Sequence, residues 1–155
     1  FRGDPRRSCK CNPTQIERYM ARISGPLLDR IDLQVTLRAL TSEERLSESG
    51  ELLSGKIRAN VERARARQNA RFAGTSISCN AFMPGVEVRK YCSFSDAGFD
   101  AFKTKIETES ISTRSTDRLA KVTRTVADLL NSDDVEPIHV NRACDFVIGG
   151  MLREK

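Results

Sequence analysis

Apolar residues at helical spacing dominate this sequence, and they restrict the fold to a mainly α one. After residue 50, hydrophobic positions recur every three or four residues in four separate segments, which places them on one face of a helix in each segment. Four such helices can bury a common core, so we expect a four-helix bundle-like domain. The last segment opens with Pro137, and its apolar face carries Val140, Ala143, Cys144, Val147 and Ile148.

Capping signals predict where the helices begin. Asn12 precedes a proline and stands three residues before Gln15, which is the spacing of a capping box. Ser95 has the character of an N-cap, and the flanking Phe94 and Phe99 have the spacing of a hydrophobic staple. The helices predicted from these signals and from the periodicity cover residues 13–23, 51–72, 95–106, 112–130 and 137–148.

One segment departs from this pattern. Residues 31–37 alternate apolar and polar side chains, which predicts a half-buried β-strand. Because a lone strand forms no sheet, we expect its partner strands upstream, in a longer protein of which this chain is a fragment. Residues 41–50 have the composition of a linker, and residues 73–92 are expected to be irregular with one helical turn. The predicted domains are residues 1–40 and 41–155.

The composition argues against a membrane partner and favours an anionic one. The 155 residues include 26 Lys and Arg against 21 Asp and Glu, and most of the basic residues are arginine, whose rigid fork of donors suits phosphate. No stretch of about 18 apolar residues exists, so we expect no membrane span, and we expect no secretory signal. The odd number of five cysteines then favours reduced thiols in a cytoplasmic protein.

Self-contained catalysis is not expected from this chain. Residues 50–57 match the G-x-x-x-x-G-K part of a phosphate-binding loop, but Ile57 replaces the Ser or Thr that would hold Mg²⁺, and no strand precedes the match. We therefore interpret the segment as the start of a helix. The single histidine, His139, has no Ser, Cys or carboxylate placed by the sequence to form a triad, so a capping or surface position is expected.

Two cysteines on a predicted loop, Cys9 and Cys11, are candidate zinc ligands. Thiolates bind zinc, but a structural site requires about four ligands and this pair supplies two. Cys79 and Cys92 could complete a site, although their spacing gives no support for it. Unligated thiols remain the alternative.

Two arginines occupy positions that favour a nearby anion. Arg30 lies at the turn before the predicted strand, and Arg114 lies in the first turn of the helix that begins near Ser112. A cation in that first turn opposes the helix dipole unless an anion docks at the N–H groups of the helix end. Arg118 follows four residues later on the same side. Ion pairs with neighbouring carboxylates are the alternative.

The segment SGPLLDRIDL at residues 24–33 resembles a segment of the magnesium-chelatase-like AAA+ ATPases of the competence-associated ComM/YifB type. The fold implied by the resemblance is the helical lid of an AAA+ ATPase over residues 41–155, joined to the end of its α/β core over residues 1–40. The resemblance continues in register, so that it covers nearly the whole chain, through residues 9–19, 65–72, 80–85 and 112–129.

The resemblance also assigns roles to residues. Arg30 would be the arginine finger that reaches the γ-phosphate of ATP in a neighbouring subunit. Arg114 would be the sensor-2 arginine that reaches the nucleotide of its own subunit, with Arg118 in the same region, and Cys9 and Cys11 would be half of a four-thiol zinc site. ATP and Mg²⁺ would be cofactors of the full-length protein, whose phosphate loop is expected upstream. The fragment alone is expected to require no cofactor and to hydrolyse no ATP.

The partners implied by the resemblance are neighbouring subunits of a homo-hexameric ring and, for ComM-type members, DNA during recombination. Arg63, Arg67 and Arg71 on the predicted helix 51–72 could contact DNA phosphates. A solvated helix face is the alternative, because no aromatic residues interleave for stacking. The ATPase motor of a true magnesium chelatase and a non-enzymatic helical DNA-binding module remain the alternative functions.

Overall fold

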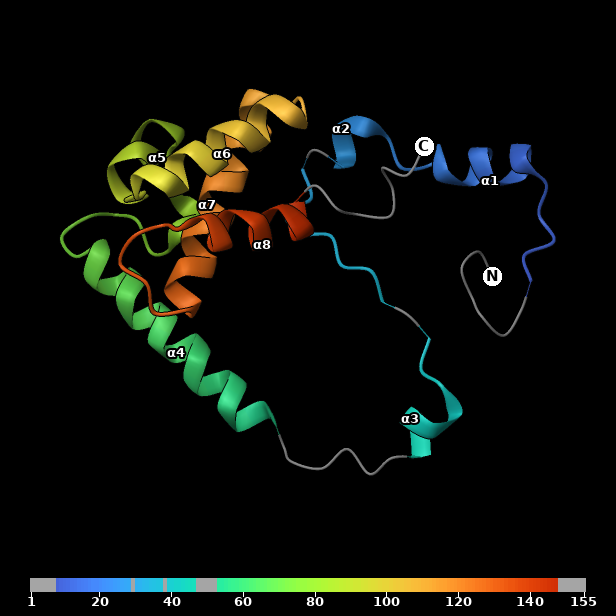
Figure 1. Ribbon diagram of the computed structural model, residues 1–155, viewed down its shortest axis with the longest axis horizontal. Coiled ribbons are helices and arrows are strands. Elements are labelled where there is room, and N and C mark those ends of the chain that lie inside the picture. Colours follow the sequence, from blue (N-terminus) through green and yellow to red (C-terminus); the bar gives the residue numbers. More distant parts are fainter. Residues whose placement is uncertain (1–7, 29, 38, 47–52, 148–155) are drawn as a thin grey trace.

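The fold is mainly α, as the sequence predicts. The computed structural model describes residues 8–28, 30–37, 39–46 and 53–147, and Figure 1 shows helices and no sheet among them. In chain order the elements are α1 (Pro13–Met20), α2 (Gly25–Leu28), α3 (Ser42–Leu46), α4 (Leu53–Arg71), the 3₁₀-helix η1 (Asn80–Phe82), α5 (Gly85–Tyr91), α6 (Asp96–Thr108), α7 (Thr113–Leu129) and α8 (Pro137–Val147).

Helices α4 to α8 pack into one helical body around α7. Helix α7 contacts α4, η1, α5 and α8, and α8 also packs on α6. Buried hydrophobic side chains of these helices and their loops meet in one core, which includes Phe72, Met83, Phe102, Leu119 and Val140. A bundle-like group of helices is therefore present where the periodicity predicts it.

The predicted capping interactions are present. The Asn12 side chain accepts a hydrogen bond from the Gln15 N–H at 2.8 Å, and the Asn12 N–H donates to the Gln15 side chain at 3.0 Å, which completes the capping box of α1. The Ser95 hydroxyl accepts a hydrogen bond at 3.0 Å from the N–H of Gly98, the third residue of α6. The rings of Phe94 and Phe99 lie edge to face with centroids 6.0 Å apart. Local signals therefore suffice to locate both helix starts.

A glycine sets the distance between the start of α6 and the loop before α8. A Cβ atom on Gly98 would lie 1.9 Å from the carbonyl oxygen of Val135, so a larger residue at this position would push the two segments apart. The Ser95 N–H donates to the same carbonyl at 3.2 Å, and the Val135 N–H donates to the Ser93 carbonyl at 2.7 Å. These contacts hold the two loops together at one end of the body.

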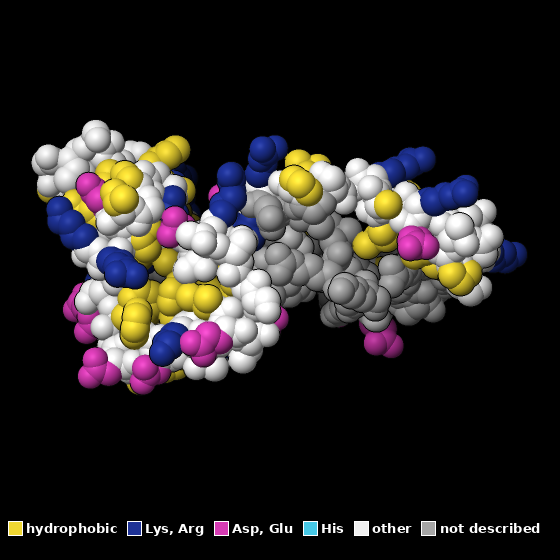
Figure 2. Space-filling view, turned by 90° about the horizontal axis from the view of Figure 1, so that it is seen from above, with side chains coloured by type: hydrophobic (Ala, Val, Ile, Leu, Met, Phe, Trp, Pro, Cys, Tyr) yellow, Lys and Arg dark blue, Asp and Glu magenta, His cyan; other side chains and the backbone are white. Residues whose placement is uncertain are grey.

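The prediction of a strand at residues 31–37 is wrong in this structure. The segment pairs with no other described segment, and its apolar side chains at Leu33, Val35 and Leu37 are exposed. A strand requires a neighbouring strand along its length, whereas the described contacts of this backbone are isolated hydrogen bonds with helices, from the Gln34 N–H to Phe146 and from Arg118 to the Ile31 carbonyl. Figure 2 shows hydrophobic side chains at the surface of the N-terminal part as well as of the helical body.

The predicted linker at residues 41–50 contains a helix that the composition does not reveal. Helix α3 follows Thr41, whose N–H donates to Glu44 Oε2 at 2.9 Å while its Oγ1 accepts from the Glu44 N–H at 3.2 Å. This reciprocal pair is a capping box, and its T-x-x-E spacing is readable in the sequence. Figure 1 shows α1 and α3 lying apart from the helical body.

Helix α4 packs along only part of its length. The sequence predicts one apolar face over residues 51–72, and Ala64 and Phe72 are indeed buried. Ile57 and Val61 on the same face are 58% and 45% exposed, respectively. Figure 1 shows the first half of α4 extending away from the body, so this half has no partner helix among the described residues.

The remaining predictions concern the connectors and the helix ends. Residues 73–92 are more regular than predicted, because both η1 and α5 lie there, with α5 directly after Pro84. Residues 50–52 and Ile148, which belong to predicted helices, lie outside the described residues. None of the described helices is both long enough and apolar enough to cross a membrane.

Candidate functional site

A cavity of about 490 Å³ lies where the first half of α7 faces the segment that contains Asp32. Three basic side chains of α7 line the cavity, Arg114, Arg118 and Lys121. Two carboxylates, Asp32 and Asp117, line it as well. The charged groups of the wall therefore have a positive balance, which suits an anionic ligand with several oxygens.

Helix geometry brings these basic residues together. Arg114, Arg118 and Lys121 are four and three residues apart, so they share one face of α7. Helix α7 begins after Ser112, whose hydroxyl accepts from the Ser115 N–H at 3.3 Å, and its first turn contains no acidic residue. The positive end of the helix dipole and the cation at Arg114 thus act on the same side of the cavity.

Arg114 and Arg118 lie one turn apart in different environments. Arg114 is exposed, and no described residue forms a hydrogen bond or ion pair with its guanidinium. Arg118 is only 6% exposed. Its Nη1 donates to the carbonyl oxygen of Ile31 at 2.9 Å, and its Nη2 donates to the Ser115 hydroxyl at 3.2 Å. Arg114 is therefore the arginine of this pair that can meet a ligand without giving up a protein contact.

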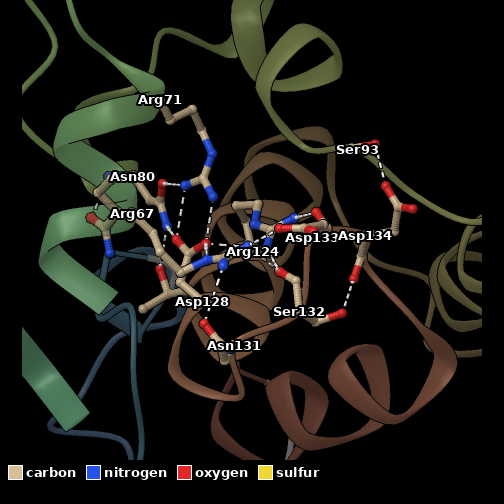
Figure 3. Close-up of polar contacts among 12 residues, drawn as sticks. Arg67, Arg71, Asn80, Ser93, Arg124, Asp128, Asn131, Ser132, Asp133 and Asp134 are labelled. Carbon is tan, nitrogen blue, oxygen red and sulfur yellow. Dashed lines mark hydrogen bonds and ion pairs between the residues drawn. The ribbon is translucent and has the colours of Figure 1, made fainter. Parts of the chain in front are cut away.

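A second polar cluster lies inside the helical body, and Figure 3 shows it in close-up. Asp128 of α7 accepts hydrogen bonds from Arg71 at both carboxylate oxygens and from Nδ2 of Asn80 at 2.9 Å, and it forms an ion pair with Nη2 of Arg124 at 3.1 Å. Nε of Arg67 lies 3.8 Å from the same carboxylate. The side chains of Asp128 and Arg124 are fully buried. This Asp128 cluster joins α4, η1 and α7.

The protonation state of Asp128 follows from these contacts. Burial alone would raise the pKa of the carboxyl, because a charge is costly away from water. The hydrogen bonds from Arg71 and Asn80 and the charge of Arg124 outweigh burial, so the pKa of Asp128 lies below its ordinary value of 3.8. Asp128 is therefore ionised at neutral pH and compensates the surrounding guanidinium groups.

Comparison with known families identifies the chain. Residues 51–146 match the family described as magnesium chelatase, subunit ChlI C-terminal, and residues 2–45 match the family described as magnesium chelatase, subunit ChlI. The chain belongs to the magnesium chelatase family. The match covers the helical body with its cavity and its Asp128 cluster, and it covers the segment that carries Arg30.

Individual relatives support this membership. The uncharacterized protein YifB of Escherichia coli (strain K12) is 30% identical over 142 residues, which are 88% of this chain and 26% of that protein. Competence protein ComM of Haemophilus influenzae is 31% identical over 139 residues, with the same two shares. An uncharacterized protein of Mycobacterium tuberculosis (strain H37Rv) is 32% identical over 127 residues, which are 82% of this chain and 25% of that protein. The chain spans about a quarter of the length of these curated relatives.

In this magnesium chelatase family member, Arg30 lies apart from the cavity wall. The Arg30 side chain is exposed, and its N–H donates to the Leu27 carbonyl at 3.0 Å. It directly precedes Ile31, whose carbonyl receives the hydrogen bond from Arg118. The structure therefore brings Arg114 and Arg118 together as predicted, with Arg30 beside the contact between the segment and α7. The roles of all three arginines stay predictions.

The arginines predicted to contact DNA lie in unequal positions on α4. Arg71 belongs to the Asp128 cluster, and Arg67 donates to the Ser132 carbonyl at 3.0 Å and pairs with Asp133. Arg63 is exposed beside Asn60, to which it donates a hydrogen bond. Contact with DNA stays a prediction for all three, and Arg63 is the one whose removal would disturb the body least.

The cysteines considered as zinc ligands lie in two separate places. Cys9 and Cys11 precede α1, where a hydrogen bond with Cys9 and the charge of its thiolate raise the pKa of Cys11. Cys79 and Cys92 are buried in the helical body. No group of three or more His, Cys, Asp or Glu side chains in the described ranges could hold a metal ion. These residues fit neither a complete zinc site nor a Mg²⁺ site, and zinc at Cys9 and Cys11 stays a prediction.

His139 has a structural position at the start of α8. Its Nδ1 accepts a hydrogen bond from the Glu136 N–H at 2.8 Å, which confirms the capping interpretation. The surface alternative is wrong, because His139 is only 3% exposed. Burial and the nearby charge of Arg124 lower the pKa of His139 below its ordinary value of 6.5, so the imidazole is neutral at neutral pH.

Proposed function

We propose that the full-length protein is an ATP-driven AAA+ motor of the magnesium-chelatase-like type. In this motor, residues 1–40 are the end of the α/β core with Arg30 as the arginine finger, and residues 41–155 are the helical lid with Arg114 as the sensor-2 arginine. The observation that carries the proposal is the position of Arg114. It is exposed on the wall of a cavity with a positive balance of charge, at the N-terminal end of α7.

Arginine suits both roles for electrostatic reasons. Phosphoryl transfer develops negative charge on the oxygens of the transferred group, and a fixed guanidinium stabilises that charge. Arg114 contacts phosphate oxygens of the nucleotide in its own subunit, while Arg30 reaches the nucleotide of the next subunit in a homo-hexameric ring. Arg114 acts from a fixed support, because α7 already presents it on the wall of the cavity. The phosphate-binding loop and the ligands of Mg²⁺ belong to the rest of the full-length protein.

The proposed biological role is DNA recombination during transformation. One relative is named a competence protein, and α4 carries the exposed basic side chain of Arg63. DNA binding by the full-length protein should weaken steeply with salt, because phosphate contacts release counterions. The motor of a true magnesium chelatase is the alternative, supported by the family description, and it predicts ATP hydrolysis without such DNA affinity.

The test is Arg114→Ala in the full-length protein. Turnover of ATP should fall by about 10²–10³-fold, which is the loss typical of one preorganised donor to a developing charge. Arg89→Ala, a change at an exposed residue of α5, is the control and should leave kcat and KM unchanged. The 155-residue chain alone should show no turnover. Unchanged kcat and KM in Arg114→Ala would refute the sensor-2 role, and turnover by the chain alone would refute the motor.

A further inference from the structure

Two polar contacts hold residues 31–34 on the helical body. Arg118 donates to the Ile31 carbonyl at 2.9 Å, and the Gln34 N–H donates to the carbonyl oxygen of Phe146 on α8 at 2.8 Å. The apolar side chains of this segment remain exposed, so hydrophobic burial does little to fix its position. Within the described part of the chain, these two contacts tie the segment to α7 and α8.

Arg118 is well placed to hold this segment on α7 and poorly placed to bind a phosphate. Its guanidinium is buried and donates to two protein oxygens, the Ile31 carbonyl and the Ser115 hydroxyl. Turning the guanidinium toward a ligand would leave buried acceptors without a donor, which is costly. No described residue accepts a hydrogen bond from the Arg114 guanidinium. The two arginines thus lie on one helix face, but Arg118 is buried and hydrogen-bonded to protein oxygens, whereas Arg114 is exposed.

We infer that Arg118 is a positioning residue for Arg30. It locks the lid helix α7 to the backbone one residue after Arg30, and this contact sets where the Arg30 guanidinium reaches in the neighbouring subunit. This inference rests on the proposed function, and it replaces the predicted role of Arg118 as a ligand of the ATP phosphates. A movement of the lid over the nucleotide of its own subunit would then shift Ile31, and with it Arg30 at the nucleotide site of the neighbouring subunit.

The inference predicts a particular kinetic defect. Arg118→Ala in the full-length protein should lower kcat by about 10²-fold, because misplacing a reacting group by roughly an ångström has that effect. ATP affinity should remain at the wild-type value, since Arg118 does not touch the nucleotide of its own subunit. Arg118→Lys should recover part of kcat, because an ammonium group can still donate to the Ile31 carbonyl.

Rings that contain two kinds of subunit distinguish a positioning role of Arg118 from a role as a ligand of the ATP phosphates. Arg118→Ala subunits are mixed with subunits that cannot bind ATP but have intact arginines. A positioning role predicts recovered turnover, because the intact Arg30 of the second subunit serves the intact nucleotide site of the first. Arg30→Ala should be recovered in the same mixture, and Arg114→Ala should not, because its defect lies in its own site.

Each result of the mixture decides something. Recovery of Arg30→Ala without recovery of Arg118→Ala overturns the inference and leaves the proposed function standing. Failure to recover Arg30→Ala overturns the proposed finger and the inference together. Recovery of both variants, with Arg114→Ala unrecovered, supports the inference.

Folding is followed separately by amide hydrogen exchange in the same full-length variants. The inference predicts faster exchange in residues 31–37 of Arg118→Ala, with unchanged protection in the core of α7 and α8. If Arg118 served only the stability of the lid, exchange would rise throughout α7 and ATP affinity would fall together with kcat in both the Ala and the Lys variant. That outcome overturns the inference.

Discussion

The helical body (α4 to α8) and the N-terminal part (the described residues between 8 and 46) differ in how far their side chains are buried. In the body, the charged side chain of Asp128 is buried and paired, because Arg71 and Asn80 donate hydrogen bonds to it and Arg124 forms an ion pair with it at the junction of α4, η1 and α7. In the N-terminal part, the alternating segment leaves Val35 and Leu37 exposed. The body therefore has a core of its own, whereas the N-terminal part leaves apolar side chains exposed in this structure.

This difference bears on how the two parts would work together. The body holds Arg114 on a helix fixed by the core, and a rigid support is what an electrostatic contact with phosphate requires. The segment after Arg30 is hydrogen-bonded to that body through the Ile31 carbonyl and the Gln34 N–H. Under the proposed function, these hydrogen bonds link the position of the segment to that of α7 and α8.

The largest expected effect is at the centre of the body. Asp128→Asn keeps the shape of the side chain but leaves Arg71 and Arg124 without their counter-charge, so the free energy of unfolding of the chain should fall by about 3–5 kcal/mol. Chemical denaturation measures it. The matched control is Asp133→Asn, whose side chain is 92% exposed and whose ion pair with Arg67 should contribute less than about 1 kcal/mol. Equal losses in the two variants would show that the Asp128 cluster does not hold the body together.

A smaller effect should appear as a pH dependence carried by His139, the single histidine of the chain. Burial and Arg124 lower its folded pKa below 6.5, and Glu136 acts in the opposite direction. The unfolded chain therefore binds the proton first. The stability that the neutral imidazole contributes is complete above pH 6.5 and is lost as the pH falls below that value, by at most about 1.4 kcal/mol per pH unit.

The measurement for His139 is the free energy of unfolding between pH 7.5 and 5.5. The wild-type chain should lose stability over this interval, and His139→Gln should show a flatter curve because its side chain does not titrate. Both curves should be level above pH 7. A wild-type curve that rises toward acid would contradict the burial of a neutral imidazole.

The smallest effect is expected in the N-terminal part. Leu37→Ala in the 155-residue chain should change stability by less than about 0.5 kcal/mol, because Leu37 is 87% exposed. The same change at the buried Leu119 should cost about 2–5 kcal/mol. In the full-length protein Leu37→Ala should cost more than in the chain alone, if partner strands cover the segment there. An equal and small cost in both would argue against the predicted sheet.

Local signals predict much of this fold, and long-range contacts explain what they miss. The caps at Asn12 and Ser95 act within a few residues, so the sequence alone locates α1 and α6. The T-x-x-E box at Thr41 is equally local, and composition alone misleads there. The strand prediction at residues 31–37 fails for a different reason, because alternation describes a face that a neighbour must cover.

The contacts at the candidate sites are also partly local and partly long-range in the sequence. The spacing of Arg114 and Arg118 predicts that they share a face of α7, and they do. No spacing predicts that Arg118 donates to the Ile31 carbonyl, 87 residues away. None predicts that Asp128 accepts a hydrogen bond from Arg71, 57 residues away. The only local trace of the Asp128 cluster is the four-residue spacing of Arg124 and Asp128, which is common on helix surfaces.

We propose that Arg30 acts on ATP bound by a neighbouring subunit, so its substitution should affect ATP hydrolysis and leave ATP binding intact. ATP binding and ATP hydrolysis are measured side by side for the full-length protein and its Arg30→Ala variant. Hydrolysis should fall by about 10³-fold or more, as on loss of an arginine finger, while ATP affinity should be unchanged. Normal turnover in Arg30→Ala would contradict it.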